Sequence, residues 1–237
     1  MTHMTPEKWA GTGGYVGEVF GGLGEPLDAQ LEKLMDRAVA AGLPSIAVSP
    51  DVGRLLMVLV RLACSGTDRP RAVEVGALGG YSGLWLARGL GERGRLITIE
   101  PEPKHAAFAR SEFARAGLDG RVELRESTGL KELPRLVEEL GEGSTDVVFL
   151  DAVKSEYRGY AEHAARLLRP GGLLIADNCL GASWWITDEP GTDEGRDAVD
   201  TFNRWIGSPR SGFLSCCVTN REGLVVAQRA AAGSGAS

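Results

Sequence analysis

The chain has 237 residues, of which 43% are hydrophobic, 24% charged and 6% aromatic, a globular composition that excludes disordered and fibrous classes. Its net charge of −6 gives no positive field for nucleic acid, and no apolar run approaches the roughly 18 residues of a membrane span. The N-terminus lacks the charged start and apolar stretch of a secretory signal. Because Cys64, Cys179, Cys216 and Cys217 form no C-x-x-C pair, we expect reduced, mostly packed thiols in a cytoplasmic protein.

The first 70 residues predict an arm followed by helices. Residues 1–25 are rich in glycine, which is unfavourable inside a helix, so we expect a glycine-rich arm that is flexible or covers a site. Residues 26–70 contain two helical patterns, in which Pro26 and Pro50 suit the first turns and apolar residues recur at helical spacing. These patterns predict an N-terminal helical extension.

From residue 71 to residue 229, short apolar runs alternate with helical patterns. The expected parallel strands are 72–76, 95–100, 122–125, 146–151 and 173–177, and the helices between them fall near 81–90, 102–117, 129–140 and 156–168. Such alternation makes a parallel sheet covered by helices on both faces. Two last runs, 213–219 and 224–228, predict an antiparallel hairpin, and residues 230–237 a flexible tail. We expect one domain.

A glycine-rich loop follows the first expected strand and opens a helix, in the sequence Val73-Glu74-Val75-Gly76-Ala77-Leu78-Gly79-Gly80-Tyr81-Ser82. Glycines let the backbone approach a ligand, and the helix start offers free N–H groups. The spacing differs from the dinucleotide pattern G-x-G-x-x-G, and Glu74 suits a cationic or hydroxylated ligand better than pyrophosphate. The alternative is a plain tight turn between strand and helix.

An acidic residue, Glu100, ends the second expected strand. At this place in a doubly wound sheet, a carboxylate can accept hydrogen bonds from both hydroxyls of a ribose, whatever the adenosine ligand. The alternative is an N-cap for the helix that starts near Pro101.

Oxygen-bearing side chains follow two further strands: Asp151 comes after one, and Asp177 and Asn178 after the other. Carboxyl ends of neighbouring strands meet at the ligand crevice, so these three side chains suit Mg²⁺, while the lack of histidine and cysteine argues against zinc. Lys154 follows Asp151 by three residues and could act as a general base there. The alternatives are turn-forming Asp and Asn residues and a solvated surface lysine.

Other candidates carry weaker signals. Trp184 and Trp185 could form an apolar wall for a flat substrate, or equally pack in the core or against another subunit. His105 and His163 lie in helical patterns among charged residues, which predicts surface positions. The charged residues of 188–197 predict a solvated loop that leads into a helix.

Taken in order, Glu74-x-Gly76-x-x-x-Gly80-x-Ser82, Ile97-Thr98-Ile99-Glu100, Phe149-Leu150-Asp151-x-x-Lys154 and Ala176-Asp177-Asn178 resemble the cation-dependent class I O-methyltransferases. These enzymes use S-adenosylmethionine and include the caffeoyl-CoA and catechol O-methyltransferases. The resemblance extends from about residue 45 to residue 229 and includes Ser49-x-Asp51-x-Gly53, Phe202-Asn203 and Glu222-Gly223-Leu224.

The resemblance implies a Rossmann-like, doubly wound, seven-stranded sheet with its last strand reversed, in a homodimer. It implies that Asp151, Asp177 and Asn178 are metal ligands and that Lys154 is the catalytic base, with Asp151 and Asn178 also in the catalytic set. The implied cofactor-binding residues are Val48, Glu74, Gly76, Ser82, Glu100, Ser127, Thr128 and Asp151. Among them, Glu74, Gly76 and Ser82 would hold the methionine part and Glu100 the ribose. Ser127, Thr128 and Gly129 fall where the family contacts adenine.

These implications make the expected activity Mg²⁺-dependent methyl transfer from S-adenosylmethionine to a hydroxyl of a catechol-like or other vicinal-diol aromatic small molecule. Val153 and Glu100 match the catechol type of the family, while Thr128 replaces a usual alanine. The first alternative is a metal-independent methyltransferase of the same fold. An NAD-dependent oxidoreductase would need G-x-G-x-x-G and Tyr-x-x-x-Lys, and a non-catalytic cofactor-binding module would not need Lys154 and the acidic residues.

Overall fold

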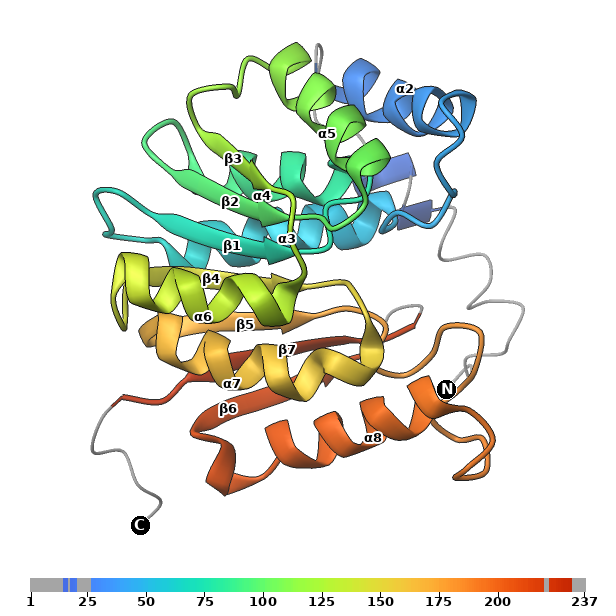
Figure 1. Ribbon diagram of the computed structural model, residues 1–237, viewed down its shortest axis with the longest axis vertical. Coiled ribbons are helices and arrows are strands. Elements are labelled where there is room, and N and C mark those ends of the chain that lie inside the picture. Colours follow the sequence, from blue (N-terminus) through green and yellow to red (C-terminus); the bar gives the residue numbers. More distant parts are fainter. Residues whose placement is uncertain (1–14, 17, 21–26, 220–221, 232–237) are drawn as a thin grey trace.

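The computed structural model describes residues 15–16, 18–20, 27–219 and 222–231. Its strands form one seven-stranded sheet in the order β3-β2-β1-β4-β5-β7-β6 (Figure 1). The strands are β1 (Arg71–Val75), β2 (Arg95–Ile99), β3 (Val122–Arg125), β4 (Thr145–Leu150), β5 (Leu168–Ala176), β6 (Phe213–Val218) and β7 (Leu224–Arg229). The first five are parallel, and β7 runs antiparallel to both β5 and β6, which confirms the expected Rossmann-like sheet with a C-terminal hairpin.

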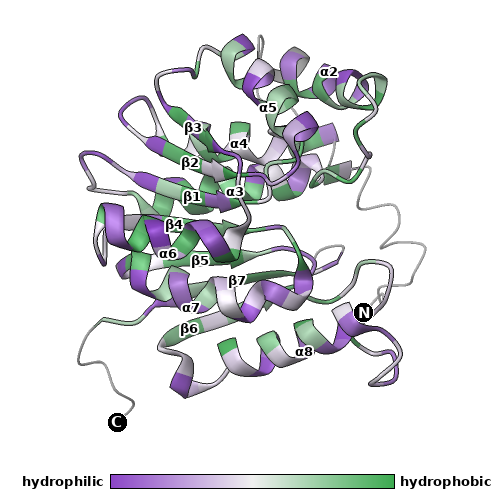
Figure 2. Cartoon of the chain, in the orientation of Figure 1, coloured by the Kyte–Doolittle hydropathy of each residue, from purple (hydrophilic) through white to green (hydrophobic). Residues whose placement is uncertain are grey.

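Helices cover both faces of this sheet. They are α2 (Leu27–Ala40), α3 (Pro50–Ala63), α4 (Tyr81–Leu90), α5 (Pro103–Arg115), α6 (Gly129–Leu140), α7 (Tyr157–Leu167) and α8 (Glu194–Ile206), with 3₁₀ turns η1 (Lys154–Glu156) and η2 (Pro209–Ser211). Successive residues of β4 enter different cores: Val147 and Phe149 pack with α2–α5, whereas Val148 and Leu150 pack with α6–α8. Hydrophobic colour accordingly follows the central strands, and polar colour the outer helix surfaces (Figure 2).

Two predicted boundaries differ from the structure. β5 begins at Leu168, five residues before the expected start. Its pairing with β4 shifts register between Thr145 and Val147, and this shift allows the strand to include the Pro170-Gly171-Gly172 segment. At the N-terminus, residues 15–16 and 18–20 are helical, where a glycine-rich arm was expected. The rest of residues 1–25, and residues 232–237 of the expected tail, lie outside the described residues.

All four cysteines are free, but only half are packed. Cys64 and Cys179 are buried, whereas Cys216 and Cys217 are exposed on β6. The expectation of mostly packed thiols was wrong for this pair because β6 is the edge strand, and adjacent residues there face solvent on both sides. No helix in the described part of the chain is long and apolar enough to cross a membrane.

The register of the parallel strands sets four residues at one level. Gly76, Glu100, Asp151 and Asp177 each directly follow a strand, β1, β2, β4 and β5 respectively. Their N–H groups still donate to neighbouring strands, over 2.9 Å (to Ile99), 3.0 Å (to Arg125), 2.9 Å (to Val75) and 3.0 Å (to Leu150). The sheet therefore holds these four positions side by side along its carboxyl edge.

Candidate active site

A cavity of about 690 Å³ opens at the carboxyl edge of the sheet. Segment 44–48, between α2 and α3, also lines it. Of the residues expected at the site, the cavity brings together Val48, Gly76, Ser82, Glu100, Asp151, Lys154, Asp177 and Asn178. The structure thus gathers side chains from most of the predicted motifs around one space.

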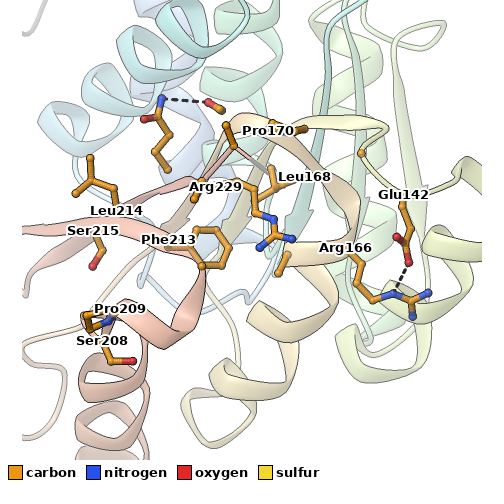
Figure 3. A pocket seen from close by; sticks show the side chains of 18 residues that line it. Glu142, Arg166, Leu168, Pro170, Ser208, Pro209, Phe213, Leu214, Ser215 and Arg229 are labelled. Carbon is orange, nitrogen blue, oxygen red and sulfur yellow. Dashed lines mark hydrogen bonds and ion pairs between the residues drawn. The ribbon is translucent and has the colours of Figure 1, made fainter. Parts of the chain in front are cut away.

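A larger hollow, of about 1100 Å³, lies at the opposite end of the sheet (Figure 3). The start of β5 and the hairpin strands line it, and its charged groups already have partners. Arg166 Nε lies 2.9 Å from Glu142 Oε1, and the guanidinium of Arg229 lies 5.9 Å from the ring centre of Phe213. Because ligands of parallel sheets bind at the carboxyl ends of strands, we place the chemistry in the smaller cavity.

The glycine loop after β1 is shaped by a close backbone approach. Gly76 has φ +99°, and a Cβ there would lie 2.0 Å from the carbonyl oxygen of Asp151, so only glycine fits. Leu78 also has positive φ, +46°, and its N–H donates to Glu100 Oε2 over 2.8 Å. The loop therefore contacts the segments that follow two neighbouring strands.

Glu74 lies behind this loop rather than along the described cavity lining. It is fully buried, and its two carboxylate oxygens accept hydrogen bonds from Ser82 Oγ and Thr98 Oγ1, each over 2.6 Å. Burial raises the pKa of Glu74 to about 7, although both hydrogen bonds oppose that shift. In this structure Glu74 supports Ser82, which itself lines the cavity.

Glu100 is 6% exposed and fixed by two backbone donors. Besides the Leu78 N–H, the N–H of Glu102 donates to Glu100 Oε1 over 3.0 Å. The N-cap of α5 is Glu102, so the alternative that Glu100 caps this helix was wrong. The fixed carboxylate is available to a ligand with hydroxyl groups.

His105 is a site residue that the sequence did not indicate. The expected surface position was wrong: His105 lines the cavity, and its Nδ1 lies 3.4 Å from Glu100 Oε1. It stands on the first turn of α5, which starts at the same edge of the sheet as Glu100. That short separation from an acidic strand end was the signal available in the sequence. His163, also expected at the surface, is half-buried on α7.

Lys154 lies at the centre of the polar corner of the cavity. Its Nζ lies 3.2 Å from Asp151 Oδ1, 2.7 Å from Asn178 Oδ1 and 3.3 Å from the carbonyl oxygen of Asp177. The side chain is only 16% exposed, so the alternative of a solvated surface lysine was wrong. Burial and the neighbouring Asp151 raise the pKa of Asp177 to about 6.

Tyr157 supports this corner and was not predicted. It is fully buried at the start of α7; its hydroxyl lies 2.6 Å from Lys154 Nζ and donates to the carbonyl oxygen of Asp177 over 3.0 Å. The same burial raises the pKa of Tyr157 well above its usual value. The Lys-x-x-Tyr spacing at the start of a helix was the signal for it, because such residues share a helix face.

The predicted adenine contacts lie at the end of β3, outside the described lining of the cavity. Ser127 has a buried Oγ with no hydrogen-bond partner among the described residues, which leaves it available to a ligand. Thr128 is exposed at the N-cap position of α6. Gly129 is packed so tightly that a Cβ would lie 2.5 Å from Tyr160 Cε1.

Trp184 and Trp185 lie in different environments. Trp184 is 7% exposed and belongs to the core beneath α6–α8, which confirms core packing for it. Trp185 is 51% exposed, and neither side chain is part of the described cavity lining. The wall beside Asn178 is made instead by Ala182 and Ser183.

The polar corner fits a hard divalent cation. In the described part of the chain, no group of three or more His, Cys, Asp and Glu side chains could hold a metal ion. The candidate set is two carboxylates, Asp151 and Asp177, and the amide of Asn178, oxygen donors of the kind that Mg²⁺ takes together with water. Burial and the neighbouring Asp151 raise the pKa of Asp177 even though Lys154 lies in the same corner, and a bound cation would favour the ionised form of both carboxylates.

Comparisons with known proteins agree with this geometry. Residues 25–230 match the O-methyltransferase family. The catechol O-methyltransferase of Niastella koreensis is 39% identical over 194 residues, which cover 82% of this chain and 83% of that protein. The O-methyltransferase of Bacillus cereus, solved in complex with SAH, superimposes with a TM-score of 0.81 at 33% identity, covering 94% of this chain and 99% of that one.

A second solved structure is TomG from Streptomyces achromogenes, an O-methyltransferase of tomaymycin synthesis in complex with SAM. It superimposes with a TM-score of 0.81 at 32% identity and covers 97% of this chain and 100% of that one. The similarity therefore extends over the sheet, the helical extension and the cavity between them.

We predict that Glu74 makes stability depend on pH. Its pKa is about 7 in the folded chain, against an ordinary value of 4.5 for a glutamic acid side chain, so folding favours the protonated carboxyl. The contribution of Glu74 to the free energy of unfolding is fully present below pH 4.5 and is lost as pH rises through 7. Between pH 5 and pH 8, the free energy of unfolding measured in urea should fall by roughly 2.5 kcal/mol more in the wild type than in Glu74→Gln.

The comparison with Glu74→Gln cancels the contribution of Asp177, which both proteins share. As a control, Glu138→Gln, on the exposed side of α6, should keep the pH dependence of the wild type. Equal pH dependence in the wild type and Glu74→Gln would contradict the raised pKa.

Proposed function

Since this chain belongs to the O-methyltransferase family and is an S-adenosylmethionine-dependent O-methyltransferase, we propose that it methylates one hydroxyl of a catechol-like, vicinal-diol aromatic molecule with the help of a divalent cation. The observation that carries the proposal is the polar corner formed by Lys154, Asp151 and Asn178 in the same cavity as Glu100 and the Gly76 loop. Cation-binding oxygens and a candidate base therefore adjoin the residues expected to bind the cofactor.

We propose that the cofactor lies along the carboxyl ends of β1 and β2. Glu100 offers its carboxylate to the ribose hydroxyls, with Leu78 and Glu102 N–H groups fixing its direction. Gly76 and Ser82 border the methionine part, and the unpartnered Ser127 Oγ supports an adenine contact at the end of β3. When bound, the cofactor supplies an electrophilic methyl group.

Asp151, Asp177 and Asn178 would hold the cation, which when bound lowers the pKa of a coordinated hydroxyl from the value of about 10 of a free phenol. Lys154 Nζ would accept the proton of the acceptor hydroxyl. The exposed apolar side chains Ile46 and Val153 line the same cavity and suit a flat aromatic ring. Fixing both reactants there removes much of the entropic cost of a two-body reaction.

One observation favours a second candidate, a metal-independent methyltransferase. The Lys154 ammonium already contacts oxygens of Asp151 and Asn178 and so can balance the carboxylates without a cation. In that case the acidic residues would only shape the cavity. Metal dependence separates the two candidates directly.

We also propose a homodimer that uses β6. This edge strand has the sequence FLSCCV, without a charged residue, and Leu214 is 75% exposed on it. Edge strands of that kind are usually covered, because their free backbone groups pair with other strands. A second copy is the occupant that fits a self-complementary, antiparallel strand pair.

We predict that removal of divalent ions stops the reaction. With S-adenosylmethionine and catechol, EDTA should abolish methylation and added Mg²⁺ should restore it, because the acceptor hydroxyl otherwise stays protonated near pH 7. Resorcinol, whose hydroxyls are not vicinal, is the matched control acceptor and should be methylated poorly under both conditions. Full turnover of catechol in EDTA would favour the metal-independent candidate.

We predict that Lys154→Met lowers kcat by about 10²–10⁴-fold, since it removes the base from the polar corner. S-adenosylmethionine affinity, measured by calorimetry, should stay unchanged and show that the fold is intact. Lys131→Met, an exposed lysine on α6, is the control and should keep the wild-type kcat. An undiminished kcat in Lys154→Met at saturating acceptor would remove Lys154 from the base role.

We predict that the 25.1 kDa chain sediments as a dimer. A charged residue on the exposed edge strand, in Leu214→Lys, should shift the equilibrium to monomer because it introduces like charges into the two paired copies of the strand. Sedimentation equilibrium measures both masses. A monomeric wild type at micromolar concentration contradicts the prediction.

A further inference from the structure

The loop that carries Asn178 rests on the turn at Glu222-Gly223. The N–H of Cys179 donates to the Gly223 carbonyl over 2.9 Å, and that of Leu180 to the Glu222 carbonyl over 2.7 Å. Gly223 has φ +82°, and a Cβ there would lie 2.4 Å from Leu180 Cγ. The backbone of the turn therefore holds residues 179 and 180 of the loop independently of the Glu222 side chain.

The side chain of Glu222 has a different partner. Its carboxylate accepts a hydrogen bond from Asn178 Nδ2, and Glu222 lines the cavity beside Asn178. On the other side of the same amide, Asn178 Oδ1 accepts from Lys154 Nζ over 2.7 Å. The amide of Asn178 is thus held between an ammonium and a carboxylate.

Only one orientation of this amide satisfies both neighbours. An ammonium is a donor only, and an ionised carboxylate is an acceptor only. Rotating the amide of Asn178 by half a turn would set its NH₂ against Lys154 and its oxygen against Glu222. A donor would then face a donor at Lys154, and an acceptor would face an acceptor at Glu222. The orientation with Oδ1 toward Lys154, which also contacts Asp151, follows from the two partners.

We infer that Glu222 is a positioning residue, whose carboxylate keeps the amide oxygen of Asn178 turned toward the cation corner. The inference rests on the proposed cation dependence. A cation binds the amide oxygen and not the NH₂ group, whose lone pair is delocalised. Because Glu222 contacts the nitrogen side of the amide, its hydrogen bond does not compete with ligation at Oδ1. Partners of this kind, which orient a ligand without touching the metal, strongly affect metal affinity.

The test is direct binding of Mn²⁺ to the full chain, followed from the electron paramagnetic resonance signal of free Mn²⁺. Glu222→Leu, which removes the acceptor, should weaken binding by about 10–100-fold. Glu222→Gln keeps an acceptor oxygen for Asn178 Nδ2 and should recover most of that loss. Glu189→Leu, an exposed acid in the loop before α8, should bind Mn²⁺ like the wild type.

Calorimetric affinity for S-adenosylmethionine should be equal in all four proteins, because the backbone of the turn holds residues 179 and 180 of the loop independently of the Glu222 side chain. Wild-type Mn²⁺ affinity in Glu222→Leu overturns the inference. Equal weakening in Glu222→Gln and Glu222→Leu also overturns it, since charge rather than amide orientation would then matter. A wild type that binds no Mn²⁺ overturns it together with the cation part of the proposed function, and catechol turnover in EDTA identifies that case.

Discussion

The site depends on the contact between the backbones of Gly76 and Asp151. The two residues follow neighbouring strands, and a single Cβ on Gly76 would overlap the Asp151 carbonyl. That contact lets the loop after β1 lie flat against the loop after β4. The part of the cavity at Glu100 and the Gly76 loop, where we propose that the cofactor binds, therefore adjoins the polar corner at Asp151 and Lys154. Bringing two reactants together in methyl transfer requires this adjacency.

The site contains buried acidic side chains, and burial disfavours their ionised forms. Glu74 is fully buried, and both it and Asp177 have raised pKa values. The two acids differ in their partners: Glu74 receives hydroxyl hydrogen bonds from Ser82 and Thr98, whereas the corner at Asp177 receives an ammonium. Of these two acids, only Asp177 therefore has a positively charged group beside it. A cation and the Lys154 ammonium are two ways to supply positive charge there. In the reaction we propose, the cation supplies it, and Lys154 loses its proton and acts as the base.

The sequence predicted the strand-end residues because their positions follow from a simple rule. An acid directly after a buried parallel strand must lie at the ligand edge, whatever the helices around it do. Asp151, Asp177 and Glu100 were found in this way, and the strands themselves were found from apolar runs. The early start of β5 was missed because Pro170-Gly171-Gly172 is typical of a turn and only a register shift against β4 admits it into a strand.

Three further residues carry only weak sequence signals, because tertiary contacts place them at the site. His105 and Tyr157 are marked only by their short spacings from Glu100 and Lys154, and Glu222 reaches the site from a hairpin turn. Likewise, nothing in the sequence distinguished Trp184 from its neighbour, yet one is buried and the other exposed.

The helical extension belongs to the site as much as the sheet does. Segment 44–48 lines the cavity together with the strand ends, and α2 just before it is tied to α5 by the ion pair of Arg37 with the buried Glu112. Lys104, also on α5, donates to the Gly42 carbonyl over 3.0 Å. Because α5 also carries His105, which lies beside Glu100, one helix links the connection between α2 and α3 to the Glu100 carboxylate. Substitutions in α5 should therefore affect segment 44–48 as well as the position beside Glu100.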